Sequence, residues 1–183
     1  MFRELLERDH AEIDLLYQDV VKHFDAGIRD TVLERLDLFW ARLAVHIRAE
    51  HLHLFPAVLR SNARTLSEGK ELVPDLVSVI AQLRRDHNGF MYELAGAIKA
   101  LRAVAADDQK LAVVLKDVRE RLMVVKQNLD RHNRLEEERI YALEEISMSS
   151  EDQSRLFQLI SRELANMPSR FAKNVGANTW AKQ

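Results

Sequence analysis

The 183-residue sequence contains no cysteine, only three prolines and only five glycines. Without cysteine there can be no disulfide, thiolate metal ligand, iron–sulfur cluster or thiol nucleophile. The scarcity of helix-breaking residues favours long uninterrupted helices. No charge of either sign dominates, since 27 Lys and Arg stand against 29 Asp and Glu. This balance argues against a nucleic-acid partner, because nucleic-acid-binding proteins usually show a basic excess.

Long apolar runs are missing as well. No segment approaches the roughly 20 apolar residues of a membrane span. The opening residues, MFRELLERDHAEID, lack the apolar stretch of a signal peptide. We therefore expect a cytoplasmic protein with no membrane partner, long enough to bury one sizeable core.

Apolar residues recur at steps of three and four along most of the chain, which is typical of amphipathic helices. Gly27 is expected to end the first helix, and a capping box beginning at Thr31 is expected to open the second. The polar segment 61–71 is expected to be a loop, and Asp107–Asp108 to cap the fourth helix. The predicted helices cover 2–26, 31–60, 74–106, the stretch from 107 through 143, and 151–166.

These elements predict an all-α fold. Short connections between long helices favour an up-down-up-down antiparallel four-helix bundle, which we assign to residues 1–147. Residues 148–183 are expected to form an additional C-terminal helix, opened by a capping box at 150–153, and a tail that packs on the bundle. The sequence leaves open whether this helix covers the bundle or forms a homodimer contact.

Four of the seven histidines fall in a repeated pattern. The triplet RDH at 8–10 recurs at 85–87, and HIRAE at 46–50 has a counterpart in HNRLE at 132–136. Residues four positions apart lie on the same side of a helix, so each His-x-x-x-Glu pair can aim an imidazole and a carboxylate at one point. A single inward histidine is usually structural, but the repeated order on four helices indicates a shared metal site.

All the candidate ligands lie on the apolar stripes of their helices. Four imidazoles and two carboxylates are costly to bury unless they are paired or coordinated. Two metal ions that share both carboxylates would satisfy them, and this ligand chemistry suits Fe, Mn or Zn. The alternative is a metal-free helical interaction module. The predicted ligands are His10, His46, Glu50, His87, His132 and Glu136.

This order of ligands resembles the hemerythrin-like, or HHE cation-binding, domain over roughly residues 1–147. The resemblance implies a non-haem centre of two iron ions in a four-helix bundle. It also implies that the centre binds O2, NO or peroxide for sensing, storage or detoxification, and it leaves open whether the protein is an enzyme.

Two positions differ from the oxygen-carrying hemerythrins. Met91 stands where those proteins have a second third-helix histidine, and Glu136 follows His132 at a shorter spacing than their aspartate. The set of four histidines and two glutamates is similar to bacterial di-iron proteins implicated in repair of iron centres after nitrosative stress. That similarity implies an iron-handling or iron-donating alternative, although the cysteine-containing segment common in those proteins has no counterpart in this cysteine-free chain.

Other residues are expected near the site. Asp14, one turn from His10, is either a hydrogen-bond acceptor that orients a ligand histidine or a boundary residue in water. Tyr17 is a core residue or a gating residue at the apolar end of the site. His53 is expected to line a polar mouth together with Arg3 and Arg139, through which small ligands enter.

The remaining polar residues close to the ligands are expected to take no part in the site. His23 and His51 are interpreted as bystanders, and Glu137 as part of a solvated face. Arg48 is expected to point away from the core and to pair with an acidic residue on a neighbouring helix.

Overall fold

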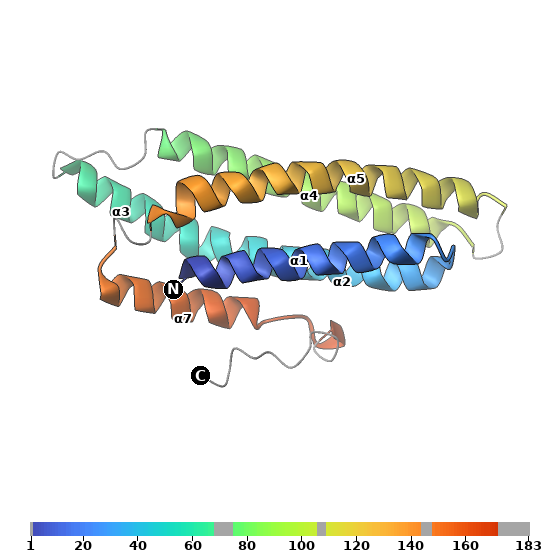
Figure 1. Ribbon diagram of the computed structural model, residues 1–183, viewed down its shortest axis with the longest axis horizontal. Helices are drawn as coiled ribbons and strands as arrows, with labels where there is room; N and C mark the ends of the chain where they lie inside the picture. Colours follow the sequence, from blue (N-terminus) through green and yellow to red (C-terminus); the bar gives the residue numbers. More distant parts are fainter. Residues whose placement is uncertain (1, 68–74, 106–108, 144–147, 172–183) are drawn as a thin grey trace.

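The computed structural model describes residues 2–67, 75–105, 109–143 and 148–171, and the described residues are helical with no strand (Figure 1). The all-α prediction is therefore confirmed, while the up-down-up-down order of the bundle stays a prediction. Among the described helices, none is long and apolar enough to cross a membrane. The α-helices are α1 (Phe2–Phe24), α2 (Arg29–Ala49), α3 (Phe55–Ser67), α4 (Leu76–Ala103), α5 (Leu111–Glu136) and α7 (Ser150–Leu164).

Two π-helical turns interrupt the long helices. The turn η1 (Glu50–Leu54) joins α2 to α3, and η2 (Glu137–Tyr141) follows α5. A π turn accommodates one extra residue, so the residues beyond it are rotated by about 100° from the positions that an α-helix would give them. Leu54 and Ile140 consequently face the core and are fully buried.

The connection between α1 and α2 is tighter than predicted. Gly27 has a φ of 66°, in the left-handed region that favours glycine, and its N–H bonds to the Phe24 carbonyl, as expected for the end of a helix. The next helix begins at Arg29, without a side-chain cap at Ile28. The prediction that a capping box at Thr31 opens the second helix was therefore wrong, because the helix already begins two residues earlier, directly after the glycine turn.

The predicted loop at 61–71 was also wrong in its first part. Helix α3 continues to Ser67, and within it the Thr65 hydroxyl donates a hydrogen bond to the Ser61 carbonyl one turn earlier. Ser61 and Asn62 are themselves buried. Residues 68–74, with Gly69 and Pro74, lie outside the described residues.

Two other predicted caps have different outcomes. Asp107–Asp108 lie outside the described residues, and α5 begins at Leu111. The last helix is capped one residue earlier than predicted, because the Ser149 Oγ accepts a hydrogen bond from the Asp152 N–H at 3.2 Å.

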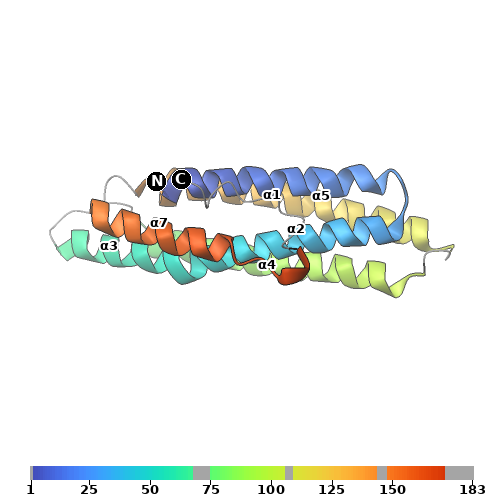
Figure 2. The same ribbon diagram turned by 90° about the horizontal axis from the view of Figure 1, so that it is seen from below.

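Helix α7 packs along α1, α2 and η1 (Figures 1 and 2). The buried Arg42 guanidinium donates to the Leu164 carbonyl at 2.8 Å, and Arg48 pairs with Glu163. Beyond α7, the 3-10 turn η3 (Ser169–Phe171) places Phe171 against Leu38. Helix α7 therefore covers the α1/α2 pair, whereas the division into units 1–147 and 148–183 stays a prediction.

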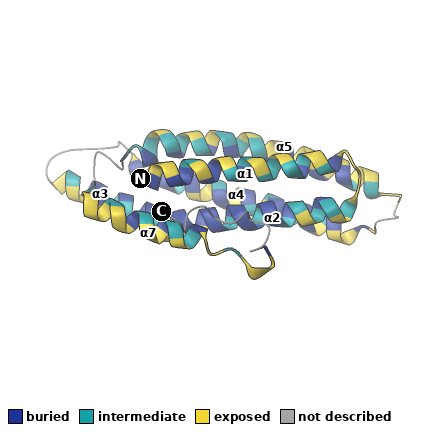
Figure 3. Ribbon diagram, turned by 60° about the horizontal axis from the view of Figure 1, so that its bottom comes forward, coloured by how far each residue is buried: buried dark blue, intermediate teal, exposed yellow. Residues whose placement is uncertain are grey.

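Buried side chains line the inner faces of the helices, and exposed ones lie on the outside (Figure 3). The two larger apolar clusters lie at successive levels of the bundle. One cluster contains Phe2, Leu54 and Ile140. The other contains Phe39 and Leu94. The polar residues of the repeated pattern lie between these clusters.

Candidate metal centre

The structure brings all six predicted ligands together in two adjacent groups that share both glutamates. We call His10, His46, Glu50 and Glu136 the first pocket, and Glu50, His87, His132 and Glu136 the second pocket. Within each pocket one donor atom per residue lies within 4.8 Å of the others. Neighbouring donors around an ion with bonds of about 2.1 Å lie about 3.0 to 3.4 Å apart, so the residues are close enough to share an ion.

In the second pocket the donor atoms point at one another without forming hydrogen bonds. His132 Nε2 lies 3.0 Å from Glu136 Oε1, and His87 Nε2 lies 3.4 Å from Glu50 Oε2. Each of these atoms is buried and has no hydrogen-bond partner within the described chain. Buried polar atoms are normally satisfied. Four unsatisfied nitrogen and oxygen atoms around one point fit a metal ion, which would accept all of them.

Each imidazole in the two pockets uses its Nδ1 for a contact outside the pocket. In the first pocket, His10 Nδ1 lies 2.8 Å from Glu137 Oε1 and His46 Nδ1 lies 2.8 Å from Asp9 Oδ2. These bonds orient the rings so that the Nε2 atoms face inward, which is the usual arrangement behind a metal-bound histidine.

The second pocket has corresponding partners. His87 Nδ1 lies 2.9 Å from His51 Nε2, and His132 Nδ1 lies 3.4 Å from Asp86 Oδ2. The interpretation of His51 as a bystander and of Glu137 as a merely solvated residue was therefore wrong. Both follow a pocket glutamate directly in sequence, and the π turn that begins there carries them toward the imidazoles.

Asp9 and Asp86 were missed as orienting residues, although the repeated RDH triplet contained the signal. Each aspartate precedes a ligand histidine but bonds to the ligand histidine of the next long helix. Asp9 is fully buried and also pairs with the buried Arg42, whose guanidinium lies 3.0 Å from Glu12 as well. This network connects the first pocket to α7 through the Leu164 carbonyl.

Tyr141 contributes a hydroxyl to the first pocket only. Its oxygen lies 2.8 Å from Glu50 Oε1, 3.2 Å from His10 Nε2 and 3.4 Å from Glu136 Oε2. The side chain is fully buried, and its ring stacks on His10 with centroids 5.7 Å apart. Sequence reasoning missed this residue because the π turn η2, which places it, leaves no clear mark in the sequence.

The two shared carboxylates have opposite electrostatic environments. Burial, reinforced by the charge of Glu136, raises the pKa of Glu50 well above its usual range. Burial also acts to raise the pKa of Glu136, but the charges of His132 and the hydrogen bond from His10 hold it well below its usual range. In the metal-free protein Glu50 is therefore protonated more readily than Glu136.

Within each pocket the two imidazoles have opposite pKa shifts: the pKa is raised for His10 and His132 and lowered for His46 and His87. Burial lowers the pKa of His10, but the hydrogen bonds and charges of Glu136 and Glu137 outweigh it and raise the pKa to about 8. Burial lowers the pKa of His87 to about 2, and the neighbouring imidazoles of His132, His46 and His51 lower it further, against the opposing charge of Glu136. A neutral imidazole is the form that binds metal, so protons compete with metal more strongly at His10 and His132 than at His46 and His87.

A family model for the hemerythrin HHE cation-binding domain matches residues 1–143, which include all six predicted ligands. The chain belongs to the hemerythrin HHE cation-binding family. Comparison with curated proteins and with solved structures gives no match. Membership of this family, together with the buried His and Glu groups, supports a metal-binding function, and iron is the typical metal of a hemerythrin domain.

Within this hemerythrin domain, Asp14 does not take the orienting role considered for it. Its carboxylate lies 2.9 Å from Lys126 Nζ and accepts a hydrogen bond from Gln18. The Nδ1 atom of His10, its nearest candidate partner, is already bonded to Glu137. Asp14 is half-exposed and sits at the rim of a shallow hollow next to His10, as the boundary interpretation predicted.

Tyr17 lies in the second apolar cluster. Its ring contacts Phe39 edge-on with centroids 6.0 Å apart, and Lys126 lies over the ring. This placement fits the core interpretation, and the apolar plug predicted at this end of the site is confirmed.

The polar mouth predicted around His53 was wrong. The extra residue in η1 turns His53 toward α7, where its Nε2 lies 3.7 Å from Glu163 Oε2. Leu54 takes the inward position at the end of η1, and Ile140 within η2 does the same in place of Arg139. The apolar cluster containing Phe2 therefore closes this end of the site.

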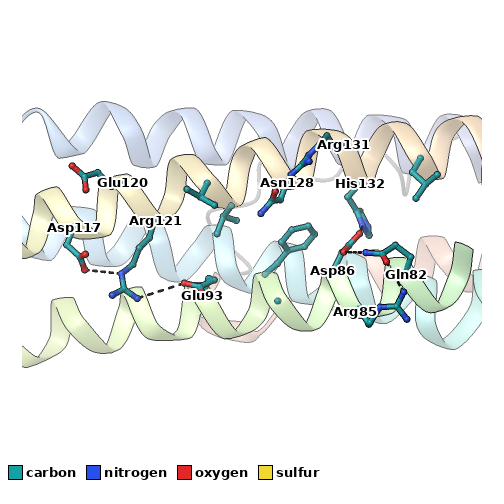
Figure 4. Close-up of a pocket in the computed structure, with 15 residues that line it drawn as sticks. Gln82, Arg85, Asp86, Glu93, Asp117, Glu120, Arg121, Asn128, Arg131 and His132 are labelled. Atoms are coloured by element: carbon teal, nitrogen blue, oxygen red, sulfur yellow. Dashed lines mark hydrogen bonds and ion pairs between the residues drawn. The ribbon is translucent and has the colours of Figure 1, made fainter. Parts of the chain in front are cut away.

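A groove between α4 and α5 reaches the second pocket from the side (Figure 4). It has a volume of about 910 Å³, and its lining includes Asp86, Gly89 and His132. Side chains of Asp117, Arg121 and others project into its far end, as the close-up shows. The corresponding surface of the α1/α2 pair is covered by α7.

Proposed function

We propose that this hemerythrin-domain protein holds two iron ions, one in each pocket, with Glu50 and Glu136 bridging them. The observation that carries the proposal is the geometry of the second pocket, where four buried donor atoms have no hydrogen-bond partner within the described chain. Manganese or zinc could occupy the same nitrogen and oxygen donors.

The physiological role that we propose is binding of a small ligand, O2, NO or peroxide, for sensing, storage or detoxification. When bound, the two irons would supply redox changes and an open coordination position. The protein supplies the surroundings: Asp9, Glu137, His51 and Asp86 hold the imidazoles by their Nδ1 atoms. The two apolar clusters exclude water along the bundle axis and strengthen the electrostatic interactions between them.

The experiment is metal analysis of protein purified without added metal, followed by anaerobic titration with O2 and with NO. We expect about two irons per chain, as in other carboxylate-bridged bundle sites, and a reversible change in the visible spectrum with iron retained. His46→Ala should lose iron, whereas His23→Ala should keep it, because the His23 ring bonds to the backbone of its own helix away from the site.

Two results would contradict the proposed role. Iron that leaves the protein on exposure to NO would support an iron-donating protein of the repair type. Full-length folded protein that binds no metal would instead support an interaction module.

A further inference from the structure

The structure has an internal pairing of two aromatic residues that the ligand pattern does not reveal. Phe55 directly follows the π turn η1, and Tyr141 closes the π turn η2, each at the fifth position after a shared glutamate. Phe55 stacks on His87 with centroids 6.1 Å apart and planes at 14°. Tyr141 stacks on His10 with centroids 5.7 Å apart and planes at 28°. The two rings therefore occupy equivalent places, one beside each pocket.

The two rings differ by one oxygen atom, and that atom lies among the ligand atoms of the first pocket. The distances from the Tyr141 oxygen to Glu50 Oε1, His10 Nε2 and Glu136 Oε2 run from 2.8 to 3.4 Å. These are close to the separations of about 3.0 to 3.4 Å between neighbouring donors on one ion. The oxygen is thus placed as a further donor of the first pocket.

The second pocket has no such donor. The side chain beside it, Phe55, offers only carbon and hydrogen. The four inward nitrogen and oxygen atoms of the second pocket, unlike those around Tyr141, have no hydrogen-bond partner in the described chain. An ion there would have the four donors of the second pocket and no further donor from the Phe55 ring.

We propose that the Tyr141 oxygen is a ligand of the ion in the first pocket, and that the small exogenous ligand binds in the second pocket beside Phe55. The inference rests on the proposed function, because it needs both pockets to hold metal. On coordination the phenol O–H bond is replaced by an oxygen–metal bond, and the proton is released to solvent, as other metal ligands release theirs. Tyr141 and Phe55 thereby make the two ions inequivalent although the six other ligands are arranged alike.

The chain offers a matched set of variants that exchange this single atom. Tyr141→Phe removes the oxygen from the first pocket, Phe55→Tyr adds one beside the second pocket, and the double variant moves it from one pocket to the other. All three keep the ring and change the buried volume little. Each is loaded with ferric iron, and its iron content and thermal unfolding are measured first.

The first readout is the visible and resonance Raman spectrum of the ferric protein, in which a phenolate bound to iron gives a charge-transfer band and enhanced ring vibrations. We expect these signals in the original protein, their loss in Tyr141→Phe with iron content retained, and their return in the double variant. Identical spectra for the original protein and Tyr141→Phe at equal iron content would overturn the inference while leaving the proposed function intact. An original protein that holds no iron would overturn the proposed function itself.

The second readout is the affinity for azide, used as a small anionic probe of an open coordination position. Phe55→Tyr should weaken azide binding about tenfold or more, equivalent to about 1.4 kcal/mol, because the new hydroxyl occupies the free side. Tyr141→Phe should leave the azide site of the second pocket in place. Weaker binding in Tyr141→Phe with unchanged binding in Phe55→Tyr would assign the exogenous ligand to the first pocket and overturn the inference.

Discussion

The first pocket and the second pocket share Glu50 and Glu136, yet they differ in what surrounds their imidazoles. Behind the first pocket stand two carboxylates, Glu137 and Asp9, and a tyrosine hydroxyl enters it. In the second pocket one imidazole has a histidine partner and the adjacent ring is a phenylalanine. A repeated ligand pattern can therefore form two chemically different sites when the neighbouring residues differ.

The two pockets also differ in how they are covered. Helix α7 lies over the α1/α2 pair and is tied to the first pocket through Arg42. The α4/α5 pair instead carries an open groove that reaches His132. Helix α7 thus covers the α1/α2 side of the first pocket, although a shallow hollow lies next to His10. The pocket with the four unsatisfied donors is the one next to the groove.

The largest effect is expected from a glutamate that serves both pockets. Glu136→Ala should remove both ions, whereas His87→Ala should remove only the ion of the second pocket, because His87 contributes to that pocket alone. The measurement is the iron-to-protein ratio after gel filtration. Equal losses in the two variants would mean that the pockets do not bind metal separately.

The next effect concerns the aspartates behind the two pockets. Asp9→Ala should destabilise the metal-free protein by about 3–5 kcal/mol, because it leaves the buried Arg42 guanidinium without its main counter-charge. Asp86→Ala should cost about 1 kcal/mol or less, since Asp86 is partly exposed and its contact with His132 is long. Urea unfolding measures the loss of unfolding free energy in both variants. Similar losses would mean that Asp9 and Asp86 stabilise the protein equally.

A third prediction tests the groove as the route to the second pocket. Gly89 lines the groove, and an added Cβ there meets no atom within 4 Å, so Gly89→Leu fills the groove without a clash. Its control is Gly96→Leu, farther along α4, where an added Cβ meets only the flexible Arg121 side chain. Stopped-flow binding of NO should slow several-fold in Gly89→Leu and remain unchanged in Gly96→Leu. Equal rates in all three proteins would exclude this route.

The smallest effect is the pH response of the metal-free protein. The pKa of His10, raised to about 8, gives stability that is fully present below pH 6.5 and is lost as the pH rises through 8. The pKa of His87, lowered to about 2, means that the unfolded state takes up a proton below pH 6.5 and the folded state does not, so stability falls on acidification. NMR titration of the imidazoles should show His10 changing near pH 8 and His87 staying neutral at pH 5. A common titration midpoint for His10 and His87 would contradict their opposite pKa shifts.

Much of the fold and of the site could be predicted because the signals were repeated. Apolar periodicity located the long helices, and the duplicated His and His-x-x-x-Glu spacing located all six residues that the structure brings together. The spacing works because those residues lie within α-helical segments, where four positions make about one turn.

The misses next to Glu50 and Glu136 share one physical cause. The π turns begin at or directly after Glu50 and Glu136, and each adds a residue that an α-helical count does not contain. Counting seven residues onward from His46 therefore placed His53 at the mouth of the site, whereas the structure turns it to α7. The same turns bring His51, Glu137 and Tyr141 inward. Apolar periodicity and capping patterns do not mark a π turn in a sequence.

The central claim is that two iron ions share Glu50 and Glu136 in unlike pockets. Its most direct test is anomalous diffraction at the iron edge from crystals of the iron-loaded protein. We predict two anomalous peaks, one in each pocket, with the Tyr141 oxygen bound to the ion in the first pocket and the Phe55 side of the second pocket free of protein donors. A single peak, or two ions with no bond from Tyr141, would contradict this account.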